Sequence, residues 1–178
     1  MFIFLVGTFY LIRLASVIRN YDIACKKWNV ALIMFSNTDT INSIALLKST
    51  YPLLKNNGVF LSTYGQVSNM AGNYEEAIPI LSRANMLLSS VANNIELGKN
   101  YNAIGEYENA EKAWTKASFM MPVLFTPHYL TAKMYNSIGE TTKAKHIATY
   151  LLRKEVKIRS PELYEMLIEM DSIINTVQ

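Results

Sequence analysis

A repeat of 33 or 34 residues is the feature that most constrains the fold of this chain. The segments GNYEEAIPILSRA, GEYENAEKAWTKA and GETTKAKHIATYL align in register at this spacing. The matching positions are the glycines Gly72, Gly105 and Gly139 and the alanines Ala77, Ala110 and Ala144. A period of this length predicts stacked supersecondary units, each of which buries its apolar face against the next unit.

The residues at the repeated positions are typical of a pair of helices. Glycine readily adopts the left-handed conformation that closes the first helix, and Gly58 is expected to end a helix in the same way. Small alanines let the paired helices approach closely, and Gly65 and Gly98 would do the same from the first helix. The large apolar residues Leu81 and Trp114 are expected to pack on the next repeat.

This pattern resembles the tetratricopeptide-repeat family. The resemblance implies an all-α fold, a tetratricopeptide-type α-solenoid of about three clear helix pairs at 58–90, 91–124 and 125–158. One degenerate pair is expected at 21–57, with a turn and helix N-cap at Asn37-Thr38-Asp39. A capping helix is expected at 159–178, because Ser160 is a good N-cap and Pro161 suits the first helical position.

The first 20 residues predict an apolar helix that spans a membrane. Residues 1–18 are apolar except for Thr8, Arg13 and Ser16, and a spanning helix needs roughly 17–25 apolar residues. Basic residues follow this segment, which favours an inner-membrane anchor with the repeats on the cytoplasmic face. A signal peptide fits poorly, because no basic residue precedes the segment. A soluble chain, in which this segment folds over the repeats as a hydrophobic first helix, is the other alternative.

Few residues in the chain suit catalysis or metal binding. There is one cysteine, Cys25, and the two histidines, His128 and His146, are 18 residues apart in different predicted helices. We therefore expect no catalytic residue, no cofactor and no metal, and conclude that the chain is not an enzyme. A net charge of +3 and a pI of about 8.9 argue against nucleic acid as a partner.

The predicted function is the binding of a protein or peptide. The first helices of stacked pairs line a concave face, and eight of their residues are expected in this groove: Ser62, Gln66, Asn69, Lys99, Asn102, Tyr129, Lys133 and Asn136. Amides can bond an extended peptide backbone, and the two lysines can pair with an acidic group. The alternative is a merely solvated polar face. The set departs from the carboxylate clamp of chaperone-binding members, so chaperone binding is not implied.

A second resemblance concerns nearly the whole chain. The stretch YPLLKNNGVFLSTYGQVSNMAGNYEEAI and the region from KASFMMP to LYEMLIEM look like the C-terminal tail of bacterial O-antigen ligase or polymerase-like membrane proteins. This implies a non-catalytic accessory module in surface-polysaccharide assembly, with Met1 an internal start in a longer protein whose membrane domain holds the ligase chemistry. An independent tetratricopeptide adaptor or scaffold, unrelated to polysaccharide, is the alternative.

Overall fold

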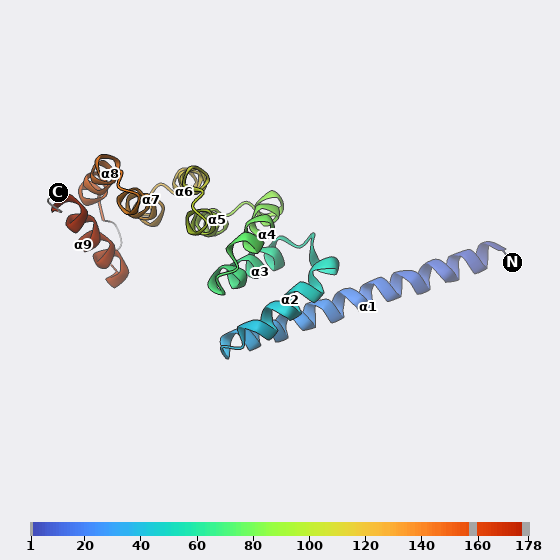
Figure 1. The fold of residues 1–178 in the computed structure, drawn as a ribbon. Coiled ribbons are helices and arrows are strands. Elements are labelled where there is room, and N and C mark those ends of the chain that lie inside the picture. The colour runs from blue at the N-terminus through green and yellow to red at the C-terminus, as the bar shows by residue number, and fades with distance from the viewer. Residues whose placement is uncertain (1, 157–159, 176–178) are drawn as a thin grey trace. The chain divides into compact units, whose positions relative to one another are not determined.

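The protein is a series of helices joined by short connections, as the computed structural model shows (Figure 1). The structure describes residues 2–156 and 160–175, and these residues form nine helices and no strand. The chain divides into two compact units, Met1–Leu88 and Ser89–Gln178. The first unit contains α1 (Phe2–Ser36), α2 (Thr40–Leu54), α3 (Gly58–Met70) and α4 (Tyr74–Leu87). The second contains α5 (Val91–Ala103), α6 (Tyr107–Met120), α7 (Thr126–Ser137), α8 (Thr141–Arg153) and α9 (Pro161–Asn175).

Helix α1 runs for 35 residues without a break. The sequence predicted a boundary at residue 20, between the apolar helix and the degenerate pair, and α1 continues through it. Its C-terminal part packs on α2, where Ala24 and Ala31 are buried. The Ser43 hydroxyl of α2 donates a hydrogen bond to the Ala31 carbonyl at 2.8 Å. The predicted turn follows α1, and the Asp39 carboxylate caps α2 by accepting from the Asn42 N–H.

The N-terminal part of α1 is exposed wherever its side chains are described, although the Tyr21 hydroxyl accepts a hydrogen bond from Asn57 Nδ2 at 3.2 Å. Every residue from 7 to 23 is exposed, and Figure 1 shows this stretch extending past α2. None of the described helices is long and apolar enough to cross a membrane, so the predicted transmembrane segment is not supported. Met1 and the side chains of residues 2–6, which belong to that segment, lie outside the description.

Three glycines end the first helices as predicted. Gly72, Gly105 and Gly139 have φ angles of 79°, 81° and 80°, in the left-handed region that glycine adopts without steric cost. The prediction for Gly58 is wrong, because it begins α3 instead of ending a helix. The Asn57 side chain caps this helix by accepting from the N–H groups of Val59 and Phe60.

Leu81 and Trp114 pack within their own helix pairs. A Cβ atom at Gly65 would overlap the Leu81 side chain, and one at Gly98 would overlap the Trp114 indole. The expectation that these large residues pack on the next repeat therefore omitted the contact that each makes within its own pair. Trp114 also belongs to a core cluster that continues into α7 and α8. The glycines explain how α3 approaches α4 and how α5 approaches α6.

Helix α9 closes the hydrophobic core of the second unit. Ser160 caps it, with its hydroxyl accepting from the Leu163 N–H at 3.2 Å. All six residues of its apolar stripe join the core cluster of α7 and α8: Leu163, Met166, Leu167, Met170, Ile173 and Ile174. Residues 157–158 of the third predicted repeat, and residues 159 and 176–178 of the predicted cap, lie outside the described residues.

Candidate functional site

The eight predicted groove residues lie on the first helices of three pairs. Helix α3 in the first unit holds Ser62, Gln66 and Asn69, while α5 and α7 in the second unit hold Lys99, Asn102, Tyr129, Lys133 and Asn136. Helices α5 and α7 are in contact.

The residues on α3 share one side of their helix. Ser62, Gln66 and Asn69 are spaced by four and three residues, the interval that aligns side chains on one face, and each is partly buried. The Ser62 hydroxyl donates to the Gly58 carbonyl at 2.8 Å, so the helix itself uses this group. Whether this face binds a partner remains a prediction.

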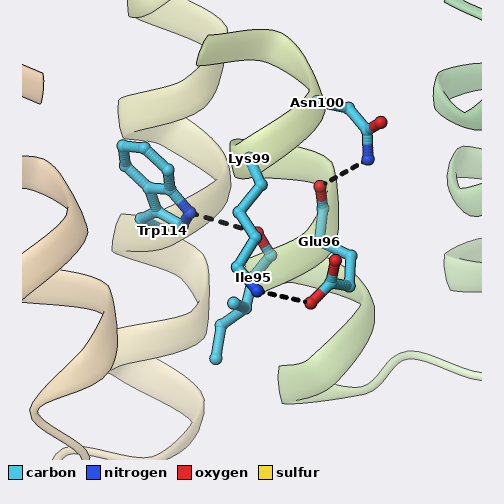
Figure 2. A network of polar contacts seen from close by, with 5 residues as sticks. All are labelled: Ile95, Glu96, Lys99, Asn100 and Trp114. Atoms are coloured by element: carbon cyan, nitrogen blue, oxygen red, sulfur yellow. Dashed lines mark hydrogen bonds and ion pairs between the residues drawn. The ribbon is translucent and has the colours of Figure 1, made fainter. Parts of the chain in front are cut away.

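On α5, the predicted lysine already has a carboxylate partner. Figure 2 shows Lys99 Nζ donating to Glu96 Oε1 at 2.8 Å, while Asn100 Nδ2 donates to the Glu96 carbonyl at 2.7 Å. The side chain of Lys99 is 44% exposed, so the pair lies near the surface and is of modest strength. A partner that offers an acidic group must compete with Glu96 for this ammonium.

Asn100 and Asn102 of α5 each have a buried Oδ1 atom that accepts no hydrogen bond from the described part of the chain, although buried polar atoms are almost always paired. The two residues differ in exposure, because Asn100 is buried and Asn102 is partly exposed. Asn136, at the matching position of α7, is exposed. The amides of Asn102 and Asn136 therefore retain hydrogen-bonding capacity that the fold does not use.

On α7, Tyr129 and Lys133 converge on a residue of α9. The Tyr129 hydroxyl donates to Glu169 Oε2 at 2.8 Å, and Lys133 Nζ lies 2.8 Å from the same oxygen. Lys133 Nζ also donates to the Tyr129 hydroxyl at 3.1 Å. These hydrogen bonds raise the pKa of Lys133 and lower the pKa of Glu169. The expected acid-binding lysine of α7 is thus already paired within the chain.

Sequence reasoning missed Glu169. It lies 36 residues after Lys133, outside the repeated segments and on a helix that was expected only to cap the core. The available signal was charge: α9 contains four acidic residues and no lysine or arginine, whereas α8 contains Lys143, Lys145 and Arg153. Opposite charge on adjacent helices indicates contact, but it does not identify which residues pair.

The second unit also contains a mainly apolar pocket of about 650 Å³ beside the connection between α6 and α7. Its walls include Met121, Phe125, Leu163 and Met166. Lys154 lies at this pocket and donates to the Pro122 and Leu124 carbonyls at 2.7 and 3.2 Å. None of the eight predicted groove residues lines it.

The histidines and the cysteine, which were the candidates for catalysis or metal binding, do not form a site together. No group of three or more His, Cys, Asp and Glu side chains that could hold a metal occurs within residues 2–156 and 160–175. The His128 ring packs edge-on against Tyr150, with ring centroids 5.2 Å apart. Burial lowers the pKa of His128, and the nearby Lys154 charge lowers it further. His146 is exposed, and Cys25 is partly buried as a free thiol.

Solved structures with the same arrangement of helices are known. MamA from Desulfovibrio magneticus RS-1 superposes with a TM-score of 0.64 at 15% identity, over 86% of this chain and 78% of that chain. A thermophilic tetratricopeptide-repeat protein of Thermus thermophilus gives 0.62 at 15% identity, over 85% and 83%. A tetratricopeptide repeat protein from Parabacteroides merdae gives 0.64 at 17% identity, over 86% and 61%.

The chain has the tetratricopeptide-repeat fold. At these identities the likeness concerns the fold alone. No protein-family model and no curated protein matches the sequence. In this tetratricopeptide-type chain, α3–α4, α5–α6 and α7–α8 are the three helix pairs that follow the α1–α2 pair.

Proposed function

We propose that this chain is a non-catalytic interaction module that binds a protein or peptide partner through the first helices of its repeats. The observation that carries the proposal is the unused hydrogen-bonding capacity of Asn102, whose side-chain oxygen has no donor among the described residues. An extended peptide offers a regular series of backbone N–H donors and carbonyl acceptors. The exposed Asn136 at the same position of α7 offers the next amide along such a peptide.

The test is binding of peptides selected by display against the full chain. We expect the Asn102→Ala, Asn136→Ala double variant to bind a selected peptide about tenfold more weakly, because each hydrogen bond contributes about 0.5–1.5 kcal/mol. The matched control is Lys112→Ala, Thr115→Ala, which changes two exposed residues of α6. Fluorescence anisotropy gives the dissociation constants. Equal binding by both double variants contradicts the groove assignment, and failure to select any peptide contradicts the function.

The lysines extend the proposal to acidic partners. Because Lys99 is paired only with a residue on its own helix and is 44% exposed, Lys99→Glu should weaken the binding of an acidic peptide while the melting temperature stays unchanged. Lys133 is paired with Glu169, so its availability depends on α9. Binding of acidic peptides that is unaltered in Lys99→Glu excludes this lysine from the site.

Attachment to a membrane through α1 is a further part of the proposal. It is supported by the exposure of large apolar side chains on the N-terminal part of this helix, among them Phe9 at 67% and Ile12 at 70%. A helix that is apolar all round is buried in protein or in lipid. We propose the inner membrane, with the repeats on the cytoplasmic face, from the basic residues that follow the apolar segment.

The most specific part of the proposal is a role in surface-polysaccharide assembly, as the tail of an O-antigen ligase-like or polymerase-like protein. This part rests on sequence resemblance alone. An antibody to residues 58–178, used on membrane and soluble fractions of the native cell, separates it from an independent adaptor. A membrane band far larger than 20.2 kDa supports the ligase-like protein, and one near that mass supports an anchored adaptor. A small band in the soluble fraction contradicts membrane attachment.

A further inference from the structure

Helix α9 covers a surface of α7 and α8 that has the properties of a helix-binding groove. We propose that this surface is a docking site for an acidic amphipathic helix of a partner protein, and that α9 occupies it in cis until the partner helix displaces it. The proposal rests on the proposed function in one respect, since it assumes that the module binds a protein partner. It adds the chemical class of that partner and a means of regulating access.

The polar part of this surface recognises a single carboxylate oxygen. Tyr129 and Lys133 are four residues apart, so their side chains lie on one face of α7. Both reach Glu169 Oε2, each at 2.8 Å, and the Lys133 ammonium also donates to the Tyr129 hydroxyl at 3.1 Å. Lys133 Nζ lies 5.1 Å from the Tyr129 ring centroid. Two donors on one oxygen form a directional site for the carboxylate of a glutamate or aspartate.

The apolar part of the surface accepts one face of a helix. Ala132, Ala144 and Ala148 are fully buried in the same cluster as Met170 and Ile173 of α9. The apolar side of α9 thus shares one core with α7 and α8, as an amphipathic helix does when its apolar face lies in a groove between other helices. A partner helix with apolar residues at the same spacing would fill the same space.

Charge selects the class of partner. Helix α9 contains Glu162, Glu165, Glu169 and Asp171 and no basic residue, whereas the neighbouring α8 contains Lys143, Lys145 and Arg153 and no acidic one. Complementary charge across an interface speeds association and disfavours partners of the wrong sign. The surface therefore favours an acidic helix over a basic one.

The contacts of α9 suit a displaceable occupant. Of its described residues, only Met170 and Ile173 are buried. The side chains of Lys133 and Glu169 are 48% and 46% exposed, so solvent screens their ion pair. A competing helix therefore has to replace one exposed ion pair and the burial of two side chains.

The experiment uses the full chain and a fluorescein-labelled peptide with the sequence of residues 160–175 as the probe. Glu169→Gln in the protein weakens the cis contact while the peptide keeps its glutamate, so we expect the peptide to bind about tenfold more tightly than to the unaltered chain, within the usual range of coupling. Glu165→Gln is the matched control, because it removes the same charge from an exposed position of α9. Adding Lys133→Gln to Glu169→Gln should abolish the gain.

Hydrogen exchange of the unaltered chain gives a second measurement. If α9 is displaceable, its amides exchange faster than those of α8, and the peptide alters exchange in α7 and α8. Exchange of α9 only at the rate of α8, or equal peptide affinity for Glu169→Gln and Glu165→Gln, overturns the proposal and makes α9 a permanent cap. A selected peptide that binds through Asn102 and Asn136 without any effect on α9 overturns this inference alone. The absence of binding in both assays overturns the proposed function as well.

Discussion

The Trp114 indole of α6 occupies the space that a side chain at Gly98 of α5 would fill. Its ring nitrogen donates to the Ile95 carbonyl, one turn earlier on α5, at 3.1 Å (Figure 2). Leu81 and Gly65 have the same relationship in the preceding pair. A glycine on the first helix and a large residue on the second thus set the distance between the paired helices.

Gly98→Ala should destabilise the chain, although alanine favours helix more than glycine does. The new methyl group overlaps the indole, and overpacking of this kind costs about 1–3 kcal/mol, which exceeds the gain in helix propensity of about 1 kcal/mol or less. Urea unfolding followed by circular dichroism measures the change. Lys99→Ala on the next residue is the control, and a Gly98→Ala variant as stable as the original chain contradicts the packing described.

Trp114→Ala should be among the most damaging single substitutions. The side chain is 1% exposed, and its loss leaves a cavity and removes the donor to the Ile95 carbonyl. Large-to-small changes of a buried tryptophan cost about 3–5 kcal/mol. The free energy of unfolding from urea titration tests this, with the exposed Phe119 changed to alanine for comparison. Similar losses for both variants would mean that Trp114 is not a core residue.

Gly105→Ala should cost stability for a conformational reason, without any clash. A Cβ atom at this position meets nothing within 4 Å, but the φ angle is 81°, and a left-handed backbone costs an L-residue about 1–2 kcal/mol. Gly105→Asn should lose less than Gly105→Ala, because asparagine tolerates this region better. Thermal melting of the two variants gives the order, and the reverse order would show that the turn relaxes to another conformation.

Stability should fall as the solution becomes acidic, in part through His128. Burial and the nearby Lys154 charge lower the pKa of this histidine, so the unfolded chain binds its proton at a higher pH than the folded chain does. The stabilising effect is therefore complete above the unfolded value of about 6.5 and is lost as the pH falls towards the lower folded value. His128→Gln should flatten this dependence. Urea unfolding between pH 8 and pH 5 tests it, with the exposed His146→Gln as control.

Local conformation and the repeat period could be predicted from the order of the amino acids alone. The left-handed glycines were predictable because only glycine takes this conformation without cost, and their spacing established the register of the three helix pairs. The Ser160 cap and the apolar stripe of α9 were also predictable, because both follow from short-range spacing along one helix.

Contacts between residues of different helices became known only from the folded chain. The pairing of Lys133 with Glu169 joins residues far apart in sequence, and no local preference identifies it. The packing of Trp114 on Gly98 needs the relative rotation of two helices. The continuous helix α1 could not be predicted either. The composition changes along this helix, but no residue in it signals a break. Its two parts differ only in that the C-terminal part is packed on α2.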